Sequence, residues 1–150
     1  MRWSIRTTNR YQRNDITTIT EMEISFPGGQ KVDARYSGFT IHTDQPVEDG
    51  GDGSAPTPFS LFLASLGTCT GYYIVAFCQR HGIPTKDIKV IAHIDRNTAT
   101  HMVERYTIDI HVPKEFPEQY KNAMVKSAES CIVKKHLTKP PRFTISVLSQ

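Results

Sequence analysis

The sequence predicts an α+β domain in which helices pack on antiparallel β-sheet. Three patterns support this fold class: strand-like segments come first, a long uncharged helical segment follows them, and a β-hairpin pattern lies beyond it. The predicted order is a β-meander, a long buried central helix, a β-hairpin, a helix pair and a final strand. With 150 residues, of which 38% are hydrophobic, we expect a single domain over residues 1–150.

The N-terminal part is predicted to form the meander. Residues 17–26 are rich in threonine and isoleucine, as in strands, and residues 27–30 read Pro-Gly-Gly-Gln, which favours a turn. Residues 31–43 continue as strand with a break near Ser37 and Gly38. These segments are close enough in sequence to pair as antiparallel neighbours.

A long helix is predicted over residues 58–81. Thr57 is a suitable N-cap, Pro58 fits the first helical position because its missing N–H group is not needed there, and Gly82 is a helix stop. Residues 58–78 carry no charge, so we expect burial on all faces of the helix. A single copy has little interior to surround such a helix, which predicts a homodimer.

The same uncharged run is long enough to cross a membrane, and Gly67 and Gly71 form a GxxxG pair. However, small and polar residues dilute it: Ser60, Ser65, Gly67, Thr68, Thr70 and Gly71. Strand patterns on both sides and the lack of a second such run favour a helix inside a soluble protein, with no membrane partner. The first residues carry no apolar core of signal-peptide length, so we expect a cytoplasmic protein.

The C-terminal half is predicted to contain a hairpin, two helices and a strand. Residues 86–96 and 103–112 alternate between apolar and polar side chains and are joined by a short link. A helix is expected to start at Pro117, and a second helical segment to carry Cys131 through Leu137 before two prolines end it. Alternating apolar residues then predict the last strand: Phe143, Ile145 and Val147.

Charge and metal-ligand patterns exclude several functions. The net charge is +3, and Lys and Arg are spread along the chain, so we expect no nucleic-acid partner. The densest basic group is predicted to be a solvated helix end, with attraction of an anionic partner as the alternative: Lys134, Lys135, His136 and Lys139. No CxxC or HxxxH spacing links the cysteines and histidines considered as metal ligands, so no metal is expected: Cys69, Cys78, His81 and His136.

Two cysteines lie in informative contexts. A glycine-rich segment and Pro58 precede residues 63–69, Leu-Ala-Ser-Leu-Gly-Thr-Cys, and residues 128–133 read Ala-Glu-Ser-Cys-Ile-Val. This combination resembles the OsmC/Ohr family of thiol-dependent proteins, which includes organic hydroperoxide reductases. The resemblance extends over nearly the whole chain. The resemblance implies an intertwined homodimer with central long helices, outer sheets and sites at the subunit interface.

The resemblance also implies a two-cysteine peroxidase with Cys69 as the peroxidatic thiol and Cys131 as the resolving thiol. The attacking thiolate becomes a sulfenic acid, and the second thiol converts it into a disulfide that a dithiol donor reduces, without a bound cofactor. Cys69 is about three turns inside its helix, where the helix dipole has little effect. A cation must therefore stabilise the thiolate. In the family an arginine does so, and the candidates here are Arg35 and, more weakly, Lys31.

The sequence departs from the peroxidase pattern at the start of the long helix. Peroxidase members place a glutamate that holds the arginine directly after the proline, where this chain has Phe59, and other members place an acid at the next position, here Ser60. Neither side chain can form an ion pair with arginine. Glu48 and Asp52 are the acidic residues just upstream that could replace it.

The remaining assignments concern packing and ligands. Phe59, Tyr72 and Tyr73 are candidates to line an apolar substrate pocket, with core packing as the alternative for the tyrosines. Cys78 is expected in the core, and a purely structural role is also the alternative for the other two cysteines. Two functions remain open: a hydroperoxide reductase, or a related dimer that binds an apolar or electrophilic small molecule and uses its cysteines as sensors or not at all.

Overall fold

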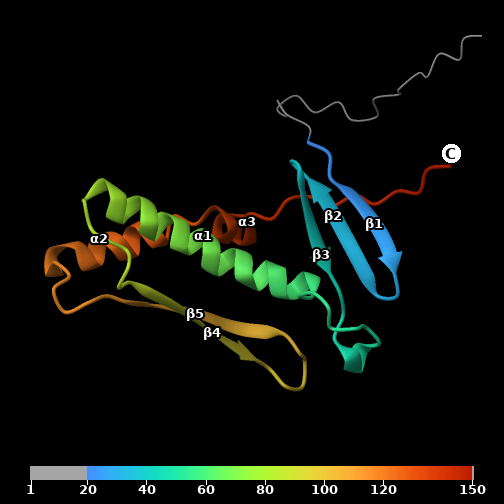
Figure 1. The fold of residues 1–150 in the computed structure, drawn as a ribbon, viewed down its shortest axis with the longest axis horizontal. Helices are drawn as coiled ribbons and strands as arrows, with labels where there is room; N and C mark the ends of the chain where they lie inside the picture. Colours follow the sequence, from blue (N-terminus) through green and yellow to red (C-terminus); the bar gives the residue numbers. More distant parts are fainter. Residues whose placement is uncertain (1–19, 150) are drawn as a thin grey trace, which may run out of the picture. The chain divides into compact units, whose positions relative to one another are not determined.

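The computed structural model describes residues 20–149 and confirms the α+β class with antiparallel sheets (Figure 1). The chain forms two compact units, Met1–Thr57 and Pro58–Gln150. The first residues of the predicted strand 17–26 lie outside the described residues.

The first unit contains the predicted meander. Strands β1 (Glu23–Gly28), β2 (Lys31–Tyr36) and β3 (Phe39–Thr43) form an antiparallel sheet in the order β1-β2-β3. The expected break between β2 and β3 is a two-residue turn in which Ser37 and Gly38 have φ values of 49° and 81°. Two successive positive φ angles match the twist of an antiparallel hairpin.

The two faces of this sheet differ in polarity. Ile24 pairs with Ala34, which pairs with Ile41, so these side chains lie on one face. Because side chains alternate along a strand, the same face also carries Val32, Tyr36 and Phe39. Phe39 is 72% exposed. The opposite face is polar and carries Glu23, Asp33, Arg35 and His42.

A loop with one turn of 3₁₀-helix (Val47–Asp49) follows β3 and is organised by the carboxylate of Asp44. This carboxylate accepts hydrogen bonds from the Ser54 amide (3.0 Å) and hydroxyl (2.8 Å), the Gln45 amide (2.8 Å) and the Asp52 amide (3.2 Å). The bonds from Ser54, aided by those from Gln45 and Asp52, outweigh burial and lower the pKa of Asp44 to about 2.

Protonation of Asp44 should therefore loosen this loop. The pKa lies below the ordinary carboxyl value, so the stabilisation is complete above about pH 4 and is lost as the pH falls towards 2. The change Asp44→Asn should have the same effect at neutral pH, seen as faster hydrogen exchange at the Asp52 and Ser54 amides. Asp49→Asn, in the same loop, is the matched control and should leave this exchange unchanged. Equal exchange in both variants would contradict the role of Asp44.

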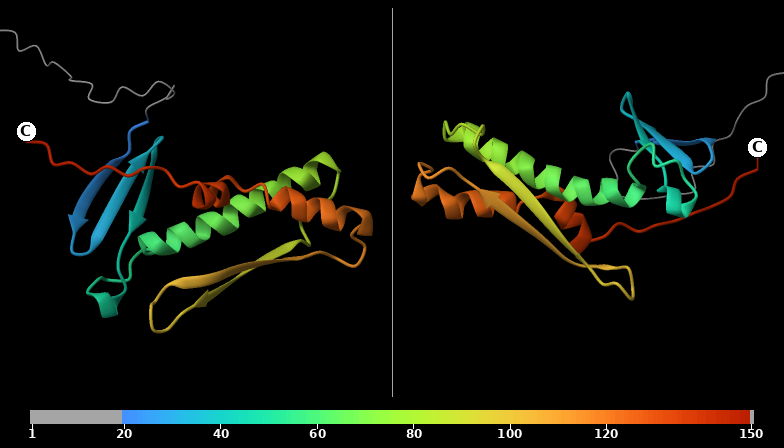
Figure 2. Two further views of the ribbon diagram at one scale, coloured as in Figure 1. Left: turned by 180° about the vertical axis from the view of Figure 1, so that it is seen from behind. Right: turned by 60° about the horizontal axis from the view of Figure 1, so that its bottom comes forward.

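The second unit is built around helix α1 (Pro58–Arg80), which confirms the predicted helix to within one residue. Strands β4 (Lys89–Arg96) and β5 (Val103–His111) form the predicted antiparallel hairpin, and helices α2 (Glu118–Ala128) and α3 (Ile132–Thr138) form the predicted helix pair. Helix α1 packs against α2, α3 and β4 (Figure 2).

The hydrophobic core of this unit lies between the C-terminal half of α1, α2 and the segment before α2. Its fully buried members are Ile74, Phe77, Cys78, Phe116, Met124 and Ala128. Cys78 is 0% exposed, and burial raises the pKa of its thiol. Cys78 is therefore a core residue, as predicted.

Helix α1 is buried on only one face within the single chain, which agrees with the expectation that one copy cannot surround it. Its hairpin and helix partners cover Leu63, Leu66, Thr70, Ile74, Phe77 and Cys78. Phe62, Tyr72 and Val75 are 37%, 67% and 40% exposed. By length and composition alone α1 could cross a membrane, because an 18-residue stretch of it has a mean hydropathy of 1.6, and 28% of that stretch is buried. Both observations reflect an apolar surface that the described residues leave uncovered.

The predicted final strand is wrong for the single chain. Residues 139–149 have no regular secondary structure, and Phe143, Ile145 and Val147 are 84%, 96% and 97% exposed. A strand requires a neighbouring strand for its backbone hydrogen bonds. Neither sheet of the described chain pairs with this segment, so its alternating pattern remains without a partner.

Candidate thiol site

The second unit brings Cys69 and Cys131 together. Cys69 comes from the middle of α1, and Cys131 immediately precedes α3. They lie close enough for the Cys69 side chain to lower the pKa of Cys131, and both are free thiols. Cys131 is 1% exposed, whereas Cys69 is partly exposed. Disulfide formation between them is therefore favoured by proximity.

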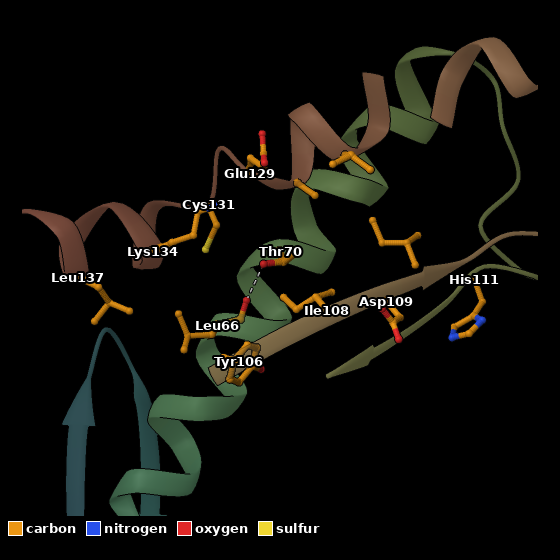
Figure 3. Close-up of a pocket in the computed structure, with 13 residues that line it drawn as sticks. Leu66, Thr70, Tyr106, Ile108, Asp109, His111, Glu129, Cys131, Lys134 and Leu137 are labelled. Carbon is orange, nitrogen blue, oxygen red and sulfur yellow. Dashed lines mark hydrogen bonds between the residues drawn. The ribbon is translucent and has the colours of Figure 1, made fainter. Parts of the chain in front are cut away.

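The local chain path explains how Cys131 reaches α1. Helix α2 ends before Glu129, and Cys131 has a non-helical conformation (φ −47°, ψ 120°) from which α3 starts in a new direction. The Ser127 hydroxyl donates a hydrogen bond to the Tyr73 carbonyl (3.2 Å) and fixes the end of α2 on α1. In Figure 3 the Cys131 sulfur points towards Thr70, the residue after Cys69.

The surroundings of Cys131 favour its thiolate. Burial raises the pKa of Cys131, but the Cys69 side chain, the Lys134 and Val133 amides and the Thr70 hydroxyl lower it by hydrogen bonding, and the net effect is a lowered pKa. The thiolate is the reactive form of cysteine. The lowered pKa therefore increases the thiolate fraction of Cys131 at a given pH.

Tyr106 on β5 holds the hairpin against α1 beside this pair. Its hydroxyl donates a hydrogen bond to the Leu63 carbonyl (2.9 Å), and a Cβ atom on Gly67 would lie 3.2 Å from that hydroxyl. Burial raises the pKa of Tyr106, so it stays a neutral phenol. Gly67 therefore allows the close approach of Tyr106, whereas a Cβ atom on Gly71 would have no neighbouring atom within 4 Å.

A cavity of about 670 Å³ lies next to the thiols (Figure 3). Cys131 and Thr70 form part of its wall, together with apolar side chains from α1, β5 and α2. The titratable residues along its wall are Tyr106, Asp109, His111, Glu129, Cys131 and Lys134. Such a mixture of apolar walls and a few polar groups is typical of small-molecule sites.

A family model described as OsmC-like protein matches residues 51–146, which is more than half of the chain and includes both thiols. The chain belongs to the OsmC-like family. The resemblance inferred from the two cysteine contexts is thereby confirmed. No curated protein matches the sequence.

Solved structures of OsmC-like proteins share this fold. A Psychrobacter arcticus 273-4 protein, named for osmotic stress induction and a detoxification response, is 22% identical with a TM-score of 0.67 over 81% of this chain and 90% of its own. An OsmC-like protein from Mycoplasma pneumoniae is 12% identical with a TM-score of 0.63 (83% and 91%). An organic hydroperoxide resistance protein OsmC from Legionella pneumophila is 18% identical with a TM-score of 0.52 (81% and 90%). At these identities the likeness concerns the fold.

The other residues that the sequence of this OsmC-like protein suggested for substrate binding do not line the cavity beside the thiol pair. Phe59 lines a second cavity of about 500 Å³, where the Arg96 guanidinium lies 5.1 Å from its ring centre. Tyr72 and Tyr73 pack edge to face at 5.5 Å, and neither lines the cavities described for residues 58–149. Their role in substrate binding stays a prediction.

The predicted cations belong to the first unit. Arg35 forms an ion pair with Glu23 at 3.4 Å, and Lys31 pairs with Asp52. Activation of Cys69 by Arg35 therefore stays a prediction. Within residues 20–149 no group of three His, Cys, Asp or Glu side chains is placed to hold a metal ion.

Sequence reasoning missed Thr70, Tyr106 and Arg96 and treated Lys134 only as part of a basic helix end. Thr70 had a usable signal, because it directly follows Cys69 in a buried helix where hydroxyl groups need partners. Tyr106 and Arg96 contact Leu63 and Phe59, which are far from them in sequence, so no local sequence pattern indicates these contacts.

Proposed function

We propose that this OsmC-like protein reduces organic hydroperoxides through Cys69 and Cys131. The observation that carries the proposal is the pair of neighbouring free thiols beside an apolar cavity. Family membership supports it, because the Legionella pneumophila relative in fold is named for organic hydroperoxide resistance. The net lowering of the Cys131 pKa increases the thiolate fraction within the pair.

Two steps of the reaction oxidise the enzyme thiols, and a third step reduces them again. A thiolate attacks the O–O bond of the hydroperoxide, forms a sulfenic acid and releases the alcohol after protonation. The second thiol attacks the sulfenic sulfur, forms the disulfide and releases water. A dithiol donor then reduces the disulfide by thiol–disulfide exchange. From the family resemblance Cys69 is the attacking and Cys131 the resolving thiol.

The proposal is tested by the consumption of cumene hydroperoxide with dihydrolipoamide as the dithiol. We expect turnover that requires both enzyme and dithiol and that is slower with hydrogen peroxide, because an apolar cavity favours an apolar substrate. A rate no higher than that of a variant without cysteines would contradict the proposal.

One observation favours the binding function as a second candidate. At the position of the family's acid, Phe59 stacks with the Arg96 guanidinium instead of forming an ion pair. If the reductase assay fails, the same apolar cavities would serve a small apolar ligand without peroxide chemistry.

The change Phe59→Glu should raise hydroperoxide turnover. Phe59 is 43% exposed and already has an arginine, Arg96, within reach of its side chain, so the new carboxylate has a cationic partner. A hydrogen bond to a charged group contributes about 1.5–3 kcal/mol, which corresponds to at most about 10- to 150-fold in rate. The measurement is kcat/KM for cumene hydroperoxide, with Phe59→Leu as the uncharged control. Equal rates for the two variants would show that an acid at this position does not activate the thiol.

A further inference from the structure

The second cavity, of about 500 Å³, lies between the first turns of α1 and the end of the β4–β5 hairpin. Most of its wall is apolar. Phe59 and Phe62 on α1 stack with their ring centres 5.7 Å apart and their planes at 28°, and they are 43% and 37% exposed. Met102 and Val103 line it from the hairpin. The two-cysteine reaction described above makes no use of this cavity.

Arg96 is the last residue of β4 and continues a row of apolar side chains. Val90, Ala92 and Ile94 precede it at alternate positions, and side chains at alternate positions of a strand lie on one face of the sheet. Val90 packs against the hydrophobic core, and the Arg96 guanidinium lies over the ring of Phe59. A charged side chain therefore occupies a position where the alternation predicts an apolar one.

An irregularity in the strand pairing explains why Arg96 has no acidic neighbour across the hairpin. Up to Asp95 the pairing is regular, and the same register would place Glu104 opposite Arg96, as in a cross-strand ion pair. Arg96 instead pairs with Val103, so Glu104 is an extra residue, as in a β-bulge. The Glu104 carboxylate accepts a hydrogen bond from the Asn97 side chain (2.7 Å). Bulges often re-aim side chains next to functional sites.

The charge of Arg96 is consequently unbalanced in the described part of the chain. Within residues 20–149 no carboxylate forms an ion pair with it, whereas Arg105, which lines the same cavity, pairs with Asp95 at 3.6 Å. A contact with the face of Phe59 uses no N–H group, so the guanidinium keeps its planar fork of donors for a carboxylate. Of the described residues that line the cavity, Glu104 alone is acidic and opposes a bound anion.

We propose that this cavity binds an aromatic monocarboxylate, with its ring against Phe59 and Phe62 and its carboxylate on Arg96. Contacts between aromatic rings contribute more than their buried area alone, and bidentate bonds from arginine to a carboxylate are among the stronger hydrogen bonds. A neutral ligand would leave the donors of Arg96 unused, and a small aliphatic acid would leave the two rings uncovered. The volume is in the range of small-molecule sites.

The site adjoins the thiol cavity but differs from it in chemistry. Leu66, Tyr106 and Leu137 line both cavities, whereas Cys131 lines only the first and Arg96 only the second. The bond from the Tyr106 hydroxyl to the backbone of α1 holds the shared wall in place. Binding of the carboxylate therefore requires neither thiol and is independent of the proposed reductase function.

The test is a ¹H–¹⁵N NMR titration of the full chain with 2-naphthoate at pH 7, with 2-naphthamide as the neutral ligand of matched shape. We expect saturable shifts at the amides of residues 96 and 101–106, with a Kd of about 1 mM or lower. The amide should bind at least about tenfold more weakly, because it lacks the charge-assisted bond. Equal affinities for the two ligands, or no saturable binding because a second copy fills the cavity, would overturn the proposal.

Variants of the two arginines isolate the role of Arg96. Arg96→Gln should weaken 2-naphthoate binding at least about tenfold and leave 2-naphthamide binding unchanged. Arg105→Gln is the matched control, because Arg105 lines the same cavity and is already paired with Asp95. It should bind 2-naphthoate nearly as well as the wild type. Equal weakening in both variants would reflect only the general positive charge of the hairpin and overturn the assignment.

Two further comparisons hold even if Arg96→Gln does not fold. Phe59→Glu places a competing carboxylate beside Arg96 and should weaken 2-naphthoate binding more than Phe59→Leu does, and the reverse order would overturn the proposal. Cys131→Ser should bind 2-naphthoate as the wild type does. Weaker binding by Cys131→Ser, or shifts centred on residues 128–134, would place the ligand in the thiol cavity and overturn the proposal without bearing on hydroperoxide turnover.

Discussion

Replacing Val75 by aspartate should convert the homodimer that we predict into a monomer. Val75 and Tyr72 are 40% and 67% exposed on the uncovered face of α1, in a helix that carries no charge until Arg80. In a dimer built on this face the new carboxylate would be buried without a partner. Burial of an unpaired polar group costs about 2–7 kcal/mol, so dimer affinity should fall at least about 30-fold.

Sedimentation equilibrium of wild type and variant at micromolar concentration measures this effect. Gln119→Asp, at an exposed and already polar position of α2, is the control and should remain dimeric. Interfaces that cover such a face typically bury more than about 2,000 Å². A folded wild-type monomer of 17.0 kDa would contradict the prediction and remove the explanation for the exposed apolar surface of α1.

Removal of either thiol of the pair should abolish formation of the disulfide, and removal of the attacking thiol should abolish hydroperoxide consumption. In well-studied enzymes the loss of a covalent nucleophile lowers kcat by up to about 10⁶, so a loss on the order of 100-fold or more is expected here. Cys78→Ala is the control, because Cys78 is fully buried in the core and should affect stability but not turnover.

Steady-state and single-turnover kinetics of Cys69→Ser, Cys131→Ser and Cys78→Ala distinguish these roles. The variant that lacks only the resolving thiol should still consume one equivalent of hydroperoxide. Full turnover by either serine variant would show that the reaction does not pass through the pair.

The secondary structure could be predicted largely because its signals are local. The cap and first-turn residues Thr57 and Pro58 and the stop at Gly82 fixed α1 to within one residue. The turn at Ser37 and Gly38 separated β2 from β3 as expected. Hydrophobic alternation also predicted the β4–β5 hairpin correctly.

The errors concern features that depend on a partner surface. Phe143, Ile145 and Val147 have the alternation of a strand, but alternation does not supply the neighbouring strand that its backbone needs. The uncharged run in α1 predicted that one chain could not surround the helix, but not that the covered face would be the one with Leu66 and Ile74.

The two thiols of the candidate site could be predicted from the sequence, but the residues that surround them could not. Cys69 and Cys131 were paired through the family resemblance, and the structure brings Cys69 close enough to lower the pKa of Cys131. The stacking of Arg96 on Phe59 and the bond from Tyr106 to Leu63 join residues far apart in sequence, so only the folded chain shows them.

The most direct test of the account is a titration of the fully reduced protein with one equivalent of cumene hydroperoxide per chain, followed by thiol counting and peptide mapping. Of the three cysteines, one free thiol should remain, at Cys78, and the mapped cross-link should join Cys69 to Cys131 within one chain. Such a bond requires Cα atoms within about 7 Å of each other. A cross-link between Cys69 and Cys78, or three free thiols with the hydroperoxide unconsumed, would contradict the two-cysteine mechanism.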